Sequence, residues 1–420
     1  MNNKLTDRDK LFSKYSRRGD QRLFAGKYDA AIEDYNEAIE LKPDYASIYS
    51  IRGYVYRIKG DFKSAIKDYN KLIVLRPDNA DAYCDRGIAY SKKGEFKRAI
   101  QDFNKAIQIK PNLADAYNGR GLTYHQMNEV DLAITDYNTA IELRPDFAKA
   151  YNNRGIAHRE KGEFDQTIDD ATKAIELYPN FAHAYSNRGN AYVRKGITSL
   201  AIKDYNKAIQ LNPELAEAYC NRGVAYEIMS ELDLAIKDHT KAIALQPDYA
   251  EAYNNRGVVY NKQDESNLAI KDFSKAIELK SEFANAYSGR GYAYYAKGEV
   301  DLAIEDYNTA IELIPNFAEV YNNRGLAYFA EGEPELAIKD LDKAIESNPD
   351  YAEAYYNRGV VWSQMQKWEN ARLDLTVAKI IGKDSLRSFQ HSNKSVVNFK
   401  EIPDINPPED IAAMLAPPQA

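Results

Sequence analysis

The chain has 420 residues, a formal net charge of −7, 44% hydrophobic residues and 28% charged residues. This composition is that of a folded protein and excludes collagen-like and strongly disordered chains. The acidic balance also argues against a nucleic-acid partner, which would be held by an excess of basic side chains. Two cysteines and five histidines leave little material for disulfides or metal sites, so we expect no metal and no cofactor.

Residues 1–11 form a polar N-terminal lead that lacks the apolar core of a signal peptide. No later stretch of the sequence approaches the roughly 20 apolar residues that a membrane-spanning helix needs. We therefore expect a cytoplasmic protein without a membrane partner.

From Phe12 onward the sequence repeats itself. An Arg-Gly dipeptide recurs every 34 residues without insertion or deletion, and this spacing divides residues 12–385 into eleven copies. We number the positions in each copy from its first residue, which is Ala114 in the fourth copy. The glycines of the dipeptide, all at position 8, are Gly19, Gly53, Gly87, Gly121, Gly155, Gly189, Gly223, Gly257, Gly291, Gly325 and Gly359.

Each copy is predicted to contain two helices. In the fourth copy Tyr117, Gly121 and Tyr124 share one face of a first helix. A break near Asn128 follows, and a second amphipathic segment runs until Pro145, which cannot continue a helix. Eleven copies therefore predict 22 helices.

The Asp or Asn that follows the proline is predicted to cap the next first helix, because these residues are good N-caps. Asp44, Asp78, Asn112 and Asp146 are examples.

Small residues stand where the two helices must approach each other. Position 8 is always Gly, and positions 20 and 27 are Ala in ten of the eleven copies. This pattern resembles the tetratricopeptide repeat (TPR), with Tyr in place of the common Trp at position 4 and Arg in place of the common Leu at position 7. The resemblance implies an all-α, right-handed superhelical solenoid of TPR repeats, with a concave groove lined mainly by the first helix of each repeat.

Position 7 is Arg and position 23 is Asp in every copy. We expect an ion pair between the two helices of a copy, or with the next copy. Arg120 also shares a helix face with Tyr117 and Tyr124, so its guanidinium can lie across a ring. The Arg row is interpreted as a structural ladder, with an anion-binding stripe as the alternative.

In the TPR fold, positions 2, 5, 6, 9, 12 and 13 tend to face the groove. Asparagines at positions 5 and 6 form a row there, and an Asn side chain offers both a donor and an acceptor to the backbone of an extended peptide. The row looks like the asparagine ladder in the TPR superhelix of O-linked GlcNAc transferases, without their catalytic domain. Alternatively, these residues are only solvated or act as spacers between helices. The predicted groove asparagines are Asn118, Asn152, Asn153, Asn187, Asn221, Asn254, Asn255, Asn322, Asn323 and Asn357.

Four aromatic residues at positions 9 and 12 are predicted to be hydrophobic anchors for the same peptide. They are Tyr54, Tyr292, Tyr295 and Phe329.

Repeat five departs most from the pattern. His158, Thr167 and Ala171 replace the usual Tyr, Ala and aromatic residue at positions 11, 20 and 24. This repeat is a candidate flexure point, or its neighbours fill the space. His239 at position 24 of repeat seven is interpreted as a core residue rather than a ligand.

Residues 386–420 form a C-terminal tail, in which a short helix is predicted near residues 408–415. We expect this helix to cap the last repeat, since an open array end must be covered. A partner-binding motif, docking in the groove and disorder are the alternatives.

No catalytic constellation is found, because the carboxylates recur in every copy and the glycines of the dipeptide stand inside helices. The sequence therefore predicts a non-enzymatic scaffold that binds extended peptide segments of partner proteins in its groove. The alternative is a structural module that forms homo-oligomers through its terminal repeats or its tail.

Overall fold

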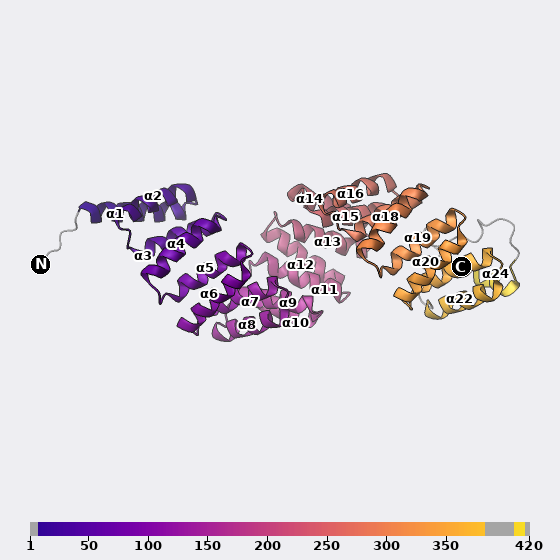
Figure 1. The fold of residues 1–420 in the computed structure, drawn as a ribbon, viewed down its shortest axis with the longest axis horizontal. Coiled ribbons are helices and arrows are strands. Elements are labelled where there is room, and N and C mark those ends of the chain that lie inside the picture. Colours follow the sequence, from indigo (N-terminus) through magenta and orange to yellow (C-terminus); the bar gives the residue numbers. More distant parts are fainter. Residues whose placement is uncertain (1–6, 383–406, 416–420) are drawn as a thin grey trace. The chain divides into compact units, whose positions relative to one another are not determined.

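The computed structural model describes residues 7–382 and 407–415, and every regular element in this part of the chain is a helix (Figure 1). The chain divides into two compact units, Met1–Leu211 and Asn212–Ala420. Unit 1 contains repeats one to six and unit 2 contains repeats seven to eleven.

The helices of unit 1 alternate between the first and the second helix of each repeat. They are α1 (Asp7–Phe24), α2 (Tyr28–Leu41), α3 (Ala46–Ile58), α4 (Phe62–Leu75), α5 (Ala80–Lys92), α6 (Phe96–Ile109), α7 (Ala114–Gln126), α8 (Val130–Leu143), α9 (Ala148–Glu160), α10 (Phe164–Leu177), α11 (Ala182–Arg194) and α12 (Thr198–Leu211).

Unit 2 continues the same alternation and adds one short helix from the tail. Its helices are α13 (Ala216–Ile228), α14 (Leu232–Leu245), α15 (Ala250–Lys262), α16 (Ser266–Leu279), α17 (Ala284–Ala296), α18 (Val300–Leu313), α19 (Ala318–Ala330), α20 (Pro334–Ser347), α21 (Ala352–Gln364), α22 (Trp368–Ile381) and α24 (Glu409–Leu415).

The turn between the two helices of a repeat needs one residue in the left-handed region, at position 15. Gly60, with φ of 79°, fills this place in repeat two, because glycine adopts positive φ without steric cost. Asn128 and Asp264 take the same conformation with φ of 63° each. The helix–turn–helix unit therefore keeps its geometry in repeats that have lost the turn glycine.

The predicted N-caps are wrong by one residue. Helix α3 begins at Ala46 with Tyr45 at the N-cap, because Pro43 and Asp44 are the central residues of a turn closed by Tyr45 N–H and the Lys42 carbonyl at 3.1 Å. Asn79 occupies the same place before α5, and its side chain accepts from Ala82 N–H at 3.1 Å. The Asp or Asn after each proline belongs to the turn and not to the cap.

The core of a regular repeat is built from small residues around one ring. In repeat six Ala201 and Ala208 on α12 are fully buried, and the Tyr205 ring lies between them on the same helix. A Cβ built on Gly189 would lie 2.7 Å from Cε1 of this ring. Glycine at position 8 is therefore required by the close approach of the ring.

Within each unit, the first helices of consecutive repeats contact one another more extensively than the second helices do, as α7 with α9 and α15 with α17. The first helices therefore form one continuous face of each unit, which we call the inner face.

The tail helix α24 packs on α22 at the end of repeat eleven. Ile411 is fully buried against the cluster around Leu375, and Arg372 Nε donates to Asp410 Oδ2 at 2.5 Å. No helix in the described ranges combines the length and apolar character needed to cross a membrane.

Candidate functional site

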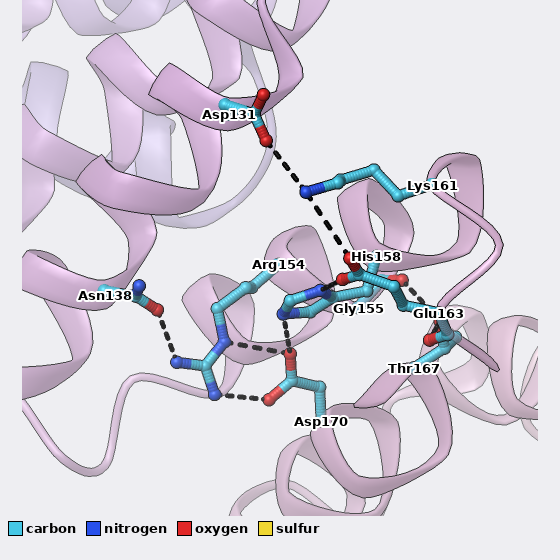
Figure 2. A network of polar contacts seen from close by, with 9 residues as sticks. All are labelled: Asp131, Asn138, Arg154, Gly155, His158, Lys161, Glu163, Thr167 and Asp170. Carbon is cyan, nitrogen blue, oxygen red and sulfur yellow. Dashed lines mark hydrogen bonds and ion pairs between the residues drawn. The ribbon is translucent and has the colours of Figure 1, made fainter. Parts of the chain in front are cut away.

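The Arg row at position 7 is engaged within the chain. Figure 2 shows Arg154, whose Nε and Nη2 donate to the two carboxylate oxygens of Asp170 at 2.9 and 2.6 Å, while Nη1 donates to Asn138 Oδ1 of the preceding repeat at 2.7 Å. Asp170 is only 4% exposed, and its hydrogen bond raises the pKa of Arg154. The pair thus joins the two helices of one repeat and also ties that repeat to its neighbour.

Tyrosines flank the same guanidinium groups. Arg290 Cζ lies 5.6 Å from the Tyr287 ring centroid and 5.9 Å from that of Tyr294, a geometry that gives a cation–π contribution. With its edge bonded to Asp306 and two rings beside it, such an arginine has little capacity left for a ligand. The geometry supports the structural ladder and argues against an anion-binding stripe.

In unit 1, the asparagines of the inner face bond to one another across repeats. Asn153 Nδ2 donates to Asn118 Oδ1 at 3.0 Å, and Asn187 Nδ2 donates to Asn152 Oδ1 at 2.9 Å. In both cases position 6 of one repeat donates to position 5 of the repeat before it.

The same relation recurs in unit 2. Asn357 Nδ2 donates to Asn322 Oδ1 at 2.8 Å, and Asn255 Nδ2 lies 3.5 Å from Cys220 Sγ. We call these bonded asparagines and their neighbours at positions 5 and 6 the amide row of each unit.

Burial divides the predicted groove asparagines into two groups. Five are at most 8% exposed, and they are Asn152, Asn187, Asn254, Asn322 and Asn357. The other five are half-buried, and they are Asn118, Asn153, Asn221, Asn255 and Asn323. The buried members have the geometry of spacers between helices, whereas the half-buried members still face outward in part.

The four predicted aromatic anchors also differ from one another. Tyr54 in unit 1 is 43% exposed, and the Arg57 guanidinium lies 5.2 Å from its ring centroid. Tyr295 and Phe329 in unit 2 are half-buried and pack against the cores of repeats nine and ten. Tyr292 is half-buried on α17. Tyr54 is therefore the most accessible of the four.

Pairs of ionisable side chains on the inner face were missed in the sequence. His125 Nε2 lies 2.9 Å from Glu160 Oε2 in unit 1, and Lys262 Nζ lies 2.8 Å from Glu227 Oε1 in unit 2. Both pairs join position 12 of one repeat to position 13 of the next, a spacing of 35 residues. The bonded asparagines are also 35 residues apart. A search for complementary side chains separated by one repeat period plus one residue could therefore have found the ionisable pairs and the asparagine pairs.

Arg57 and Asp85 are a third pair of ionisable side chains on the inner face, and Arg57 Nη2 lies 3.7 Å from Asp85 Oδ1. Burial raises the pKa of Asp85, and this long contact does not offset that effect.

Repeat five lacks the central ring because Ala171 stands at position 24, and Figure 2 shows polar side chains of this repeat. Thr167 Oγ1 donates to the Gly155 carbonyl at 3.0 Å, and His158 Nδ1 lies 2.5 Å from Glu163 Oε2. A Cβ built on Gly155 would meet Asp170 Cβ at 3.2 Å and no ring atom. Polar contacts thus replace the ring packing that most other repeats have at position 24.

Burial also decides the role of the irregular residue in repeat seven. His239 is fully buried at position 24 of that repeat, which confirms its interpretation as a core residue.

Within residues 7–382 and 407–415, no group of three or more His, Cys, Asp or Glu side chains could hold a metal ion.

Two family models match the chain. The model described as TPR repeat matches residues 19–56, 53–94, 89–128, 123–162, 198–230, 291–332 and 325–366. The model described as tetratricopeptide repeat matches residues 148–181, 216–249 and 250–283. The chain therefore belongs to the tetratricopeptide repeat family, whose members commonly mediate protein–protein interactions and are generally non-catalytic scaffolds. No curated protein matches the chain.

Several solved structures are similar to the chain. The Cut9–Hcn1 hetero-tetramer of the APC/C is 15% identical, with a TM-score of 0.54, and the match covers 91% of this chain and 95% of that one. Yeast Tom70 is 19% identical over 93% of this chain and 96% of its own, with a TM-score of 0.45. MamA is 33% identical over 41% of this chain and 94% of its own, with a TM-score of 0.35. The first of these shows the all-α repeat solenoid.

Proposed function

We propose that the protein is a non-enzymatic scaffold whose inner face binds extended peptide segments of partner proteins. The observation that carries this proposal is the set of half-buried asparagines on the first helices, exemplified by Asn153 and Asn255. One such amide stands in each of repeats four, five, seven, eight and ten, and each can donate to or accept from a peptide backbone.

The expected affinity of the asparagines alone is low. A neutral hydrogen bond contributes about 0.5–1.5 kcal/mol net, so the two half-buried amides of unit 1 supply roughly 2 kcal/mol and the three of unit 2 roughly 3 kcal/mol before ordering costs, which corresponds to Kd values above the millimolar range in each unit. An apolar side chain of the partner must therefore add to the binding. Tyr54, with 43% of its surface exposed, is the best-placed anchor for it in unit 1.

Two further parts of the proposal concern the cellular compartment and the class of molecule that binds. Cys84 and Cys220 are both unbridged, as expected in a reducing compartment, and we place the protein in the cytoplasm. The net charge of −7 favours a peptide partner over a nucleic acid.

Self-assembly is the second candidate function. Leu11 is 43% exposed and Phe24 is 91% exposed on α1, so the first repeat presents apolar side chains that a second copy could cover. At the other end, α24 packs on α22 and would oppose stacking there. Light scattering of the full chain and of a variant with Leu11 and Phe24 changed to Ser tests this candidate, since self-assembly through the first repeat predicts a smaller mass for the variant.

The experiment for peptide binding uses a variant with Asn153, Asn255 and Asn323 changed to Ala. Peptides selected from a random phage-displayed library on the wild-type protein are measured on both proteins by fluorescence anisotropy. We expect peptides that bind unit 2 to weaken about tenfold, because two backbone hydrogen bonds at ~0.5–1.5 kcal/mol each are lost there, and peptides that bind unit 1 to weaken less, because only one is lost.

A matched control changes three exposed asparagines outside the inner face, Asn180, Asn267 and Asn370, to Ala. This control should bind the same peptides as the wild type. Equal affinity of all three proteins would show that the amide row takes no part in peptide binding.

A further inference from the structure

The second helices of unit 2 carry leucines that remain partly exposed. Position 19 is Leu in four consecutive repeats, and each of these side chains is 40–43% exposed. Single exposed leucines are common on protein surfaces, whereas exposed apolar residues gathered on one surface mark interaction sites. We call these residues the leucine row, and they are Leu234, Leu268, Leu302 and Leu336 on α14, α16, α18 and α20.

The repeat itself does not require a leucine at position 19. In unit 1, Ser64, Arg98 and Gln166 occupy this position in second helices of the same length, 14 residues. Arg98 Nη2 donates to the hydroxyl of Tyr90, at position 11 of the same repeat, at 2.6 Å. A polar side chain is thus accommodated at position 19, and the unbroken run of leucines is a property of the unit 2 surface.

The turn of each following repeat adjoins the leucine row. A residue at position 14 bonds to position 18 of the repeat before it, as Gln263 Nε2 does to Asp233 Oδ1 at 3.1 Å. Lys161 Nζ makes the same contact with Asp131 Oδ1 in unit 1, at 2.9 Å. Position 18 directly precedes the leucine position, so this contact joins the start of one second helix to the turn before the next.

The contact between repeats nine and ten has a different charge. Position 14 of repeat ten is Glu331, which bonds to Asp301 at position 18 of repeat nine. Partial desolvation, followed by the neighbouring carboxylates of Asp301 and Glu333, raises the pKa of Glu331. Glu335 also stands in the first turn of α20. Carboxylates therefore gather at the step between the last two leucines of the row, where Lys161 supplies a cation in unit 1.

Position 22, one turn further along each second helix, modifies this charge. Repeat nine has Glu305 there, whereas the other three repeats have a lysine. The surface beside the row is therefore most negative between Leu302 and Leu336. The three lysines are Lys237, Lys271 and Lys339.

We propose that the leucine row docks a cationic amphipathic helix of a partner protein, with its main contact between Leu302 and Leu336. Leucine side chains offer no hydrogen bond to a peptide backbone, so the docked segment must satisfy its own N–H and C=O groups, as a helix does. Its apolar face covers the leucines, and its Lys or Arg side chains face Asp301, Glu331 and Glu333. The row lies on second helices, so this inference does not depend on the peptide binding proposed for the inner face.

The charge of the surface separates a basic helix from other occupants. A second copy of the same face would bring carboxylates against carboxylates, and like charges at close range repel. An anionic membrane surface or a nucleic acid would be repelled in the same way. A basic helix instead relieves the repulsion between Glu331 and Asp301, as Lys161 does for Asp131 within the chain.

The test uses a fluorescein-labelled synthetic peptide of about five helical turns, made of leucine and lysine with all leucines on one helix face. One companion peptide has the same residues in an order that spreads the leucines around the helix. A second companion has glutamate in place of lysine. Fluorescence anisotropy measures the binding of all three peptides to the full-length protein, and we expect only the first to bind.

The double substitution Leu302→Gln with Leu336→Gln removes the apolar side chains at the main contact. It should weaken binding of the first peptide about tenfold. The matched control is Leu132→Gln with Leu200→Gln in unit 1, where the side chains are 48% and 37% exposed and Gln166 occupies position 19 of the repeat between them. This control should bind the peptide as the wild type does.

Glu331→Lys is a second variant in case the leucine variant does not fold, since Glu331 is exposed. It copies the pair of Lys161 and Asp131 and supplies a cation from the chain itself. Binding of the first peptide should weaken about threefold, and its dependence on salt should decrease.

Equal binding of the rearranged peptide would show that charge alone attracts the probe, and equal binding of the glutamate peptide would show that charge plays no part. Either result would overturn the proposal. An unchanged affinity of the leucine variant, or no binding of the first peptide to the wild type, would overturn it as well. None of these outcomes bears on the amide row of the inner face.

Discussion

Repeats five and six of unit 1 have helices of equal length, 13 and 14 residues in each, but different centres. Repeat six holds the Tyr205 ring, which is 1% exposed and donates its hydroxyl to Asn190 Oδ1 at 2.7 Å. Repeat five has Ala171 in that place, with Thr167 and His158 as its polar substitutes.

Both repeats keep the ion pair between their helices. Arg188 Nε donates to Asp204 Oδ2 at 2.7 Å in repeat six, and Arg154 Nε donates to Asp170 Oδ2 at 2.9 Å in repeat five. The helix pair is therefore retained without the central ring when the ion pair and the small residues remain. The ring fills space between helices, and its removal is therefore expected to change stability more than architecture.

The largest effect is expected from Tyr205→Ala, which gives repeat six the centre of repeat five without its polar substitutes. Loss of a buried aromatic side chain costs about 3–5 kcal/mol, since the neighbours collapse only in part. Urea unfolding, together with hydrogen exchange of the α12 amides, measures this loss. Tyr178→Ala, at a residue that is 53% exposed, is the control, and an equally small effect of both changes would show that the ring does not stabilise the repeat.

Repeat seven has a third kind of residue at position 24, His239, and this residue makes the stability of the protein depend on pH. Burial, with a smaller contribution from the Arg256 charge, lowers the pKa of His239 to about 4 from its usual 6.5. The unfolded chain then binds the proton more readily than the folded chain does. The stabilisation that goes with a neutral His239 in the folded state is therefore complete above pH 6.5 and is lost as the pH falls toward 4. The loss amounts to about 3 kcal/mol at 1.36 kcal/mol per pKa unit.

His239→Phe, which copies Phe103 and Phe273, should remove this part of the pH dependence. Unfolding free energies of both proteins between pH 7 and pH 4 provide the measurement. Parallel curves for the two proteins would contradict a neutral, buried His239.

An intermediate effect is expected from alanine at position 8. Gly189→Ala places a Cβ 2.7 Å from the Tyr205 ring, and such overpacking costs about 1–3 kcal/mol. Gly155→Ala meets no ring and only Asp170 Cβ at 3.2 Å, and the better helix propensity of Ala, worth about 1 kcal/mol, offsets part of that contact, so it should cost less than Gly189→Ala. Thermal unfolding of the two variants tests this difference, and equal destabilisation would mean that the space above Gly155 is already filled.

The smallest effect is expected at the surface pairs that both repeats share. Lys195 of repeat six pairs with Asp165 of repeat five, and Lys161 of repeat five pairs with Asp131 of repeat four at 2.9 Å. Both aspartates are at least 76% exposed, so each change to Ala should cost at most about 0.5 kcal/mol and should disappear in 1 M salt. A salt-independent loss above about 1 kcal/mol at either pair would contradict this expectation.

Local features of the molecule could be predicted from the sequence because they depend on contacts close along the chain. The period, the two helices of each repeat and the positions of Gly189 and Ala201 follow from spacing and from residue size alone. The Arg-to-Asp pair was also expected, since positions 7 and 23 face each other in a helix hairpin. The caps failed because Pro43 and Asp44 could equally begin a helix or form a turn, and their local sequence does not separate these outcomes.

The tertiary structure decided what depends on the register between repeats. The sequence by itself determined a helical TPR array with asparagines on its inner face, because a fixed period places equivalent residues on equivalent faces. It did not determine that Asn187 bonds to Asn152, or that Arg159 bonds to Asn187. Those outcomes depend on how far one repeat is shifted against the next, which only the packed structure specifies.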